Sequence, residues 1–101
     1  LQKATKPAAA QNQTITVKKA SKTFKYKKVK KAKQTFNIGA KAKTALTYKL
    51  TKGNKKYVKV NAKGKVTIKK GAKKGTYKIT VTAAKTAAYN QATKVITIKI
   101  K

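Results

Sequence analysis

The stretch Gly75-Thr-Tyr-Lys-Ile-Thr-Val-Thr-Ala83 decides the fold that this sequence predicts. Tyr77, Ile79, Val81 and Ala83 occupy every second position, with lysine or threonine between them. Alternation with a period of two is the pattern of a β-strand that buries one face and exposes the other. Most of the residues are β-branched or aromatic, which also favours a strand. We therefore predict a half-buried strand over residues 75–83.

The C-terminal run 93–101 repeats this alternation with Ile96, Ile98 and Ile100, and it is the expected partner of the first strand. Two strands alone are at best marginally stable in water, so other segments must complete the sheet. The same pattern predicts further strands at residues 13–18, 23–26, 34–39, 45–51, 57–60 and 65–68. Turn signals lie between them, such as Gly53-Asn54 and the run 61–64, Asn-Ala-Lys-Gly. Short strands with regularly spaced turns and no long helical period predict a β-sandwich.

Residues 25–33 form the densest run of charge, Lys-Tyr-Lys-Lys-Val-Lys-Lys-Ala-Lys. Tyr26, Val29 and Ala32 are spaced by three, as in a helical turn, but like charges at neighbouring helical positions oppose a helix. We therefore predict a loop that is anchored by Val29.

The length of 101 residues suits one domain. Residues 1–12 contain the only proline and show no period of either kind, so we predict a flexible linker or tail there. The domain itself is expected to span residues 13–101. No apolar run approaches the roughly 20 residues that a membrane-spanning helix needs.

The composition excludes most catalytic and metal-binding chemistry. The chain has 29 lysines, no arginine, and no Asp, Glu, His or Cys, so its formal net charge is +29. Carboxylate pairs, nucleophile–histidine pairs, zinc sites and disulfides all require residues that are absent. We expect no enzymatic activity, no cofactor and no metal.

Three runs together carry a resemblance to a known family: Leu-Thr-Tyr-Lys-Leu at 46–50, Tyr-Val-Lys-Val-Asn-Ala-Lys-Gly-Lys-Val-Thr-Ile at 57–68, and the glycine-led strand at 70–83. With Tyr89 and the last strand, they resemble the bacterial Ig-like domains that are repeated in Gram-positive surface and secreted proteins. The resemblance implies an all-β, Ig-like β-sandwich of seven to eight short, mostly antiparallel strands. It also implies a non-catalytic spacer or presenting module at the bacterial surface, beside neighbouring domains of a larger protein. The chain departs from the family in having no acidic residue.

The lysines suggest what the module binds. Those at outward strand positions and those in the connections together predict a diffuse cationic coat, which attracts polyanions and keeps the protein monomeric. The expected partners are nucleic acid, teichoic acid or an anionic membrane surface, bound without sequence specificity. The alternative is a natural or engineered supercharged protein whose whole function is to bind or carry nucleic acid or another polyanion. The candidate polyanion-binding residues are the lysine pairs of the connections: Lys27, Lys28, Lys30, Lys31, Lys55, Lys56, Lys69, Lys70, Lys73 and Lys74.

Overall fold

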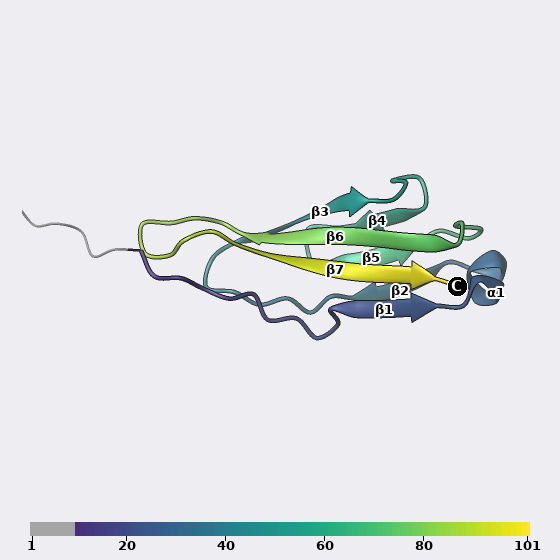
Figure 1. Cartoon of the computed structure of the whole chain (residues 1–101), viewed down its shortest axis with the longest axis horizontal. Helices are drawn as coiled ribbons and strands as arrows, with labels where there is room; N and C mark the ends of the chain where they lie inside the picture. The colour runs from purple at the N-terminus through teal and green to yellow at the C-terminus, as the bar shows by residue number, and fades with distance from the viewer. Residues whose placement is uncertain (1–9) are drawn as a thin grey trace, which may run out of the picture.

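The strand predicted at residues 75–83 lies inside the larger of two sheets that form a β-sandwich (Figure 1). The computed structural model describes residues 10–101. Its elements are β1 (Ser21–Phe24), α1 (Tyr26–Lys31), β2 (Gln34–Asn37), β3 (Leu46–Lys52), β4 (Val58–Val60), β5 (Lys65–Ile68), β6 (Gly75–Ala83) and β7 (Ala92–Ile100). The larger sheet has the strand order β1-β7-β6-β3, and the smaller has the order β2-β5-β4. The prediction of an all-β sandwich is confirmed.

β6 and β7 form a long antiparallel pair whose register runs from Gly75 opposite Ile100 to Ala83 opposite Ala92. The predicted pairing of these two strands is therefore correct. β3 pairs with the other side of β6 and has an irregularity after Leu50, while β1 pairs with β7 in parallel. The smaller sheet is antiparallel throughout, because β5 pairs with both β2 and β4.

The distribution of strands between the sheets is that of an Ig-like sandwich. In such a fold the third, sixth and seventh strands share one sheet, and the second, fourth and fifth share the other. Here β3, β6 and β7 lie in one sheet and β2, β4 and β5 in the other. β1 joins the larger sheet through its parallel pairing with β7.

The core lies between the two sheets and consists of the inward positions that the alternation predicts. Ile79, Ile96 and Ile98 of the larger sheet are 0% exposed, as are Val66 and Ile68 of the smaller one. Burying such a side chain contributes about 1.5–3 kcal/mol. Within residues 10–101 no polar or charged side chain is buried, so apolar packing and backbone ladders hold the sandwich together.

The predicted strand at residues 13–18 is wrong. Ile15 is buried and Val17 is partly buried, as the alternation predicts. The backbone, however, makes only one isolated bridge, between Thr16 and Lys41. Alternation reports which side chains face the core, but a strand also needs a partner along its whole length. The strand predicted at residues 23–26 does form, but it is shifted two residues toward the N-terminus, as β1, and Tyr26 instead begins a helix.

The prediction of a loop at residues 25–33 is also wrong, because residues 26–31 form α1. Val29 does anchor the segment: it is 0% exposed, and its carbonyl accepts a hydrogen bond from the Gly71 amide at 2.9 Å. The lysines of α1 make three pairs at neighbouring helical positions: Lys27 with Lys30, Lys28 with Lys31, and Lys27 with Lys31. At about 0.2–0.5 kcal/mol each, these pairs cost about 0.6–1.5 kcal/mol, whereas burying a valine gains about 1.5–3 kcal/mol. Three lysines in the last turn also interact favourably with the C-terminal end of the helix dipole. Burial of Val29 therefore outweighs the repulsion.

Residues 1–9 of the predicted tail lie outside the described residues. Gln11, which the same prediction included, forms a parallel bridge with Tyr89 in the β6–β7 connection. The backbone N–H of Gln11 donates to the Ala88 carbonyl at 2.9 Å, and the backbone carbonyl of Gln11 accepts from the backbone N–H of Asn90 at 2.8 Å. The Asn90 side-chain amide also donates to the Ala10 carbonyl at 3.3 Å, so residues 10 and 11 both contact the domain.

Candidate functional site

Three connections of the sandwich meet at the end that carries α1 (Figure 1). Each strand runs opposite to the strand before it in the chain. The β1–β2, β3–β4 and β5–β6 connections therefore lie at the same end of the sandwich. The last residue of the chain, Lys101, lies there too, since its carbonyl accepts a hydrogen bond from the Tyr26 amide at 2.6 Å. We call residues 25–33, 53–57, 69–74 and 101 the basic end.

All ten candidate lysines lie at this basic end. Four belong to α1, two to the β3–β4 connection and four to the β5–β6 connection, and all are exposed. The sequence separates the outermost of them by 47 positions, from Lys27 to Lys74. The fold therefore turns three separate charge runs into one surface.

Lysines cover other parts of the surface as well, but more thinly. The basic end contains 13 lysines among its 21 residues. The connections on the opposite side, at residues 10–20, 38–45, 61–64 and 84–91, contain 6 among 31. The first set is Lys25, Lys27, Lys28, Lys30, Lys31, Lys33, Lys55, Lys56, Lys69, Lys70, Lys73, Lys74 and Lys101, and the second is Lys18, Lys19, Lys41, Lys43, Lys63 and Lys85. The positive field is therefore strongest at the basic end.

Backbone hydrogen bonds hold the lysine-bearing segments of the basic end against one another. The Gly71 amide donates to Val29 of α1, and the Lys69 amide donates to the Tyr57 carbonyl of the β3–β4 connection at 2.8 Å. The Tyr77 hydroxyl donates to the Lys73 carbonyl at 2.8 Å. These bonds fix the backbone of the segments that carry the lysines, so the segments stay at one end of the sandwich although their charges repel. No acidic side chain exists in the chain to neutralise them.

A hollow of about 640 Å³ lies within the basic end beside Tyr26. Its walls are formed by Tyr26 and the lysines Lys27, Lys30, Lys31, Lys74 and Lys101. The Lys74 ammonium lies 5.3 Å from the centre of the Tyr26 ring, in cation–π contact. Lysine ammonium groups bind phosphate, sulfate or carboxylate as compact point charges, and they lack the planar fork with which arginine reads bases. The hollow therefore suits anionic groups in general.

Sequence reasoning did not single out Tyr26 and Lys101 of this hollow. Their proximity depends on β1 and β7 ending side by side, and the parallel pairing of these strands has no signal in the local pattern. Tyr48 and Tyr77 are weaker candidates for contact with a ligand. Burial raises the pKa of both Tyr48 and Tyr77, with a further contribution from Tyr57 for Tyr77, as expected for residues at the edge of a core.

No family model matches the chain, and no curated protein matches it. Two solved structures from Bacteroides fragilis share its fold. One is a "putative alpha-galactosidase" with 15% identity and a TM-score of 0.59, in which the match covers 92% of this chain and 18% of that one. The other is a "putative alpha-galactosidase/melibiase" with 18% identity and a TM-score of 0.56, with coverages of 93% and 19%. This chain thus spans less than a fifth of each neighbour, and identities this low show the fold alone.

Proposed function

We propose that this chain is a non-catalytic, Ig-like module of a larger surface or secreted protein, and that it binds polyanions through its basic end. The observation that carries the proposal is the concentration of 13 lysines in 21 residues on one side of the sandwich. Such a density of uncompensated charge attracts polyanions by long-range steering and binds them with release of their counterions.

The type of contact sets the range of partners. Lysine ammonium groups contact phosphates, sulfates and carboxylates without reading a sequence, so duplex DNA, teichoic acid and an anionic membrane surface all qualify. Affinity for each should fall steeply with salt, as the logarithm of the binding constant falls in proportion to the number of phosphates contacted. Within residues 10–101 no helix is long and apolar enough to cross a membrane.

The role as a module within a larger protein is supported by the solved structures, where this fold occupies less than a fifth of a longer chain. The glycosidase activity in the names of those proteins does not transfer to this chain. Glycoside hydrolysis ordinarily uses a pair of carboxyl groups, and this sequence contains neither Asp nor Glu. A structural or anchoring role remains the best use of the fold.

Two variants of equal charge test the role of the basic end. The first replaces Lys27, Lys30, Lys31 and Lys74 around the hollow with glutamine, and the matched control replaces Lys19, Lys43, Lys63 and Lys85, which are equally exposed on the opposite side. Each variant loses four positive charges, so the net charge is the same in both. Binding to a DNA duplex and to teichoic acid is measured over a series of salt concentrations.

The slope of log K against log salt should become shallower by about 3 to 4 in the first variant, since each lost phosphate contact contributes about 0.9. The control should keep a slope near that of the unmodified protein. Equal losses in the two variants would overturn the proposal and favour the alternative, a supercharged carrier whose whole surface binds polyanions. Binding that resists high salt would also contradict it.

A further inference from the structure

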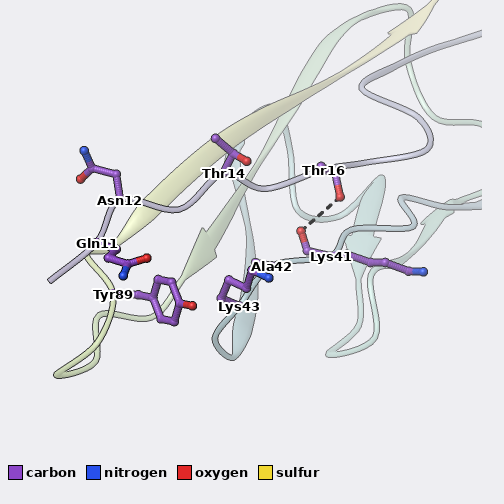
Figure 2. A pocket seen from close by; sticks show the side chains of 8 residues that line it. All are labelled: Gln11, Asn12, Thr14, Thr16, Lys41, Ala42, Lys43 and Tyr89. Carbon is purple, nitrogen blue, oxygen red and sulfur yellow. Dashed lines mark hydrogen bonds between the residues drawn. The ribbon is translucent and has the colours of Figure 1, made fainter.

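A second hollow lies on the opposite side of the sandwich from the basic end, where three distant segments of the chain meet (Figure 2). It is an open groove of about 560 Å³. Gln11, Asn12, Thr14 and Thr16 of the N-terminal segment form one wall. Residues 41–43 of the β2–β3 connection and Tyr89 of the β6–β7 connection form the other. We call it the polar groove.

Gln13 holds the three segments of the polar groove together. Its side-chain amide donates to the Thr44 hydroxyl at 3.0 Å and to the Asn90 carbonyl at 2.9 Å. Its side-chain carbonyl accepts from the Lys43 amide at 3.0 Å. One side chain thus joins the N-terminal segment to both connections, and the backbone bridges of Thr16 with Lys41 and of Gln11 with Tyr89 reinforce it. The groove is therefore preformed, which lowers the entropic cost of binding.

The side chains that face the groove differ from the Gln13 side chain, which holds its segments together. Among residues 10–101, the side chains of Gln11, Thr14 and Tyr89 make no hydrogen bond, and Thr16 makes a single long one of 3.4 Å to the Lys41 carbonyl. In Figure 2 the Gln11 side-chain amide and the Tyr89 ring lie next to each other, although they come from opposite walls of the groove. The groove thus presents amide and hydroxyl groups beside one aromatic ring, with Lys41 and Lys43 as its charged residues.

This chemistry matches a polyhydroxylated ligand. Amides and hydroxyls both donate and accept hydrogen bonds, as the hydroxyl groups of a sugar do, whereas ammonium groups only donate. The Tyr89 ring offers an apolar face for the C–H side of a pyranose and a hydroxyl at its tip. The volume lies within the range of ligand sites, about 300–1,000 Å³, and the open shape admits a chain that crosses it. The surrounding connections hold only 6 of the lysines, so polyanions are drawn more strongly to the basic end.

We propose that the polar groove binds an oligosaccharide, with Tyr89 stacking on a sugar ring and Gln11, Thr14 and Thr16 hydrogen-bonding its hydroxyl groups. This inference is independent of the polyanion-binding function, because the two surfaces share no residue. It predicts a second class of ligand that binds without counterion release and is therefore insensitive to salt.

The test is a titration of the isotopically labelled protein with three soluble probes, followed by the shifts of its backbone amide resonances. The probes are the hexamers of glucose, of N-acetylglucosamine and of galacturonic acid, each at low and at high salt. At least one should shift the resonances of residues 11–16, 41–43 and 89 and bind with a Kd that changes less than about twofold when salt screens the charges. The acidic hexamer separates electrostatic attraction from hydrogen bonding and stacking, because only the attraction between its carboxylates and the lysines weakens as salt is added.

Three variants locate the contact. Tyr89→Ala should weaken binding about tenfold, the low end of what loss of one aromatic stacking contact costs. Tyr89→Phe should retain most of the affinity, and Gln11→Ala should weaken it severalfold. Tyr26→Ala, the matched tyrosine of the basic end, should leave it unchanged. If Tyr89→Ala proves unfolded by circular dichroism, Gln11→Ala decides the test.

The proposal is overturned if none of the three hexamers shifts the resonances of the polar groove at millimolar concentration. It is also overturned if the shifts caused by the two neutral hexamers centre on α1, or if Tyr26→Ala weakens their binding as much as Gln11→Ala does. Displacement of the neutral hexamers by duplex DNA at low salt would likewise contradict a separate site.

Discussion

Replacing Gly64 with alanine should destabilise the domain more than replacing Gly71, although the two glycines have almost the same φ, +81° and +80°. This left-handed conformation costs an alanine about 1–2 kcal/mol, and the reduced freedom of the unfolded chain returns about 0.4–1 kcal/mol. Nothing lies within 4 Å of a Cβ added at Gly71. Gly71→Ala should therefore lower the free energy of unfolding by no more than about 1.6 kcal/mol, the difference between these two contributions.

Gly64 carries a second cost because it lies against Tyr48 of β3. A Cβ at this position would be 2.9 Å from both Cζ and the hydroxyl oxygen of Tyr48, which is closer than such atoms pack. Overpacking of this kind costs about 1–3 kcal/mol. The Gly64→Ala variant should therefore be less stable than Gly71→Ala by about that amount. In a domain of this size each 1 kcal/mol lowers the melting temperature by about 4–8 °C.

Urea and thermal unfolding of the two glycine variants, followed by circular dichroism, measure this difference. A Tyr48→Ala background then tests its cause, because removing the ring should remove the extra cost of Gly64→Ala and leave only the backbone contribution. Equal stabilities of the two glycine variants, within about 0.5 kcal/mol, would refute the reasoning. So would an extra cost that persists without the Tyr48 ring.

Three further predictions concern charge, a buried tyrosine and the core. Raising the salt concentration from about 0.01 M to 0.15 M, which shortens the screening length from about 30 to 8 Å, should raise the melting temperature by weakening lysine repulsion; a fall would contradict this. Tyr77→Phe should cost about 1 kcal/mol through loss of the hydrogen bond to the Lys73 carbonyl. Burial, and secondarily Tyr57, raises the pKa of Tyr77, so the folded state favours the neutral phenol. The stability that Tyr77 contributes is full below about pH 10 and is lost as the pH rises through its folded pKa. Tyr77→Phe should therefore show a smaller loss of stability at high pH than the unmodified protein, with the part due to Tyr48 retained. Ile98→Ala, at a fully buried position, should cost about 2–5 kcal/mol in urea unfolding, and a loss below about 1 kcal/mol would show that the core collapses around the cavity.

Most of the strands were predictable because their signal is local. β5 and β6 have the predicted bounds. The bounds of β2, β3, β4 and β7 differ from the prediction by one or two residues, at one end or at both. The alternation of Tyr77, Ile79 and Val81 reports directly which side chains face the core. It cannot report whether a neighbouring strand is present, and so residues 13–18 have the burial pattern of a strand without its ladder.

The helix α1 was missed for a physical reason that is visible in Val29. Repulsion between neighbouring lysines is a local effect and can be estimated from spacing alone. The opposing gain depends on the β5–β6 connection, whose Gly71 amide binds the Val29 carbonyl and whose packing leaves Val29 0% exposed. Tertiary burial outweighed the local preference.

The sequence places the ten candidate lysines in connections, but it does not show that these connections lie at one end of the sandwich. The ten lysines were recognisable as pairs in the connections, whereas the sequence suggested a diffuse coat. The polar groove had no sequence signal at all, since Gln11, Thr16 and Tyr89 are ordinary residues in three distant segments. Gln13, which joins those segments, lies in a run that predicted only a strand.

By itself, the sequence determined the chemistry and the layer architecture of this protein. A chain without Asp, Glu, His or Cys cannot supply carboxylate or imidazole catalysis, and a period of two with frequent turns packs as sheets whatever their order. Only the tertiary structure decided where the charge gathers and where the polar groove forms. Strand direction alternates along the chain from β1 to β7, so every second connection lies at the same end, and the lysine-rich connections are three that share one end. The position of a connection depends on the path of the whole chain, which no local pattern encodes.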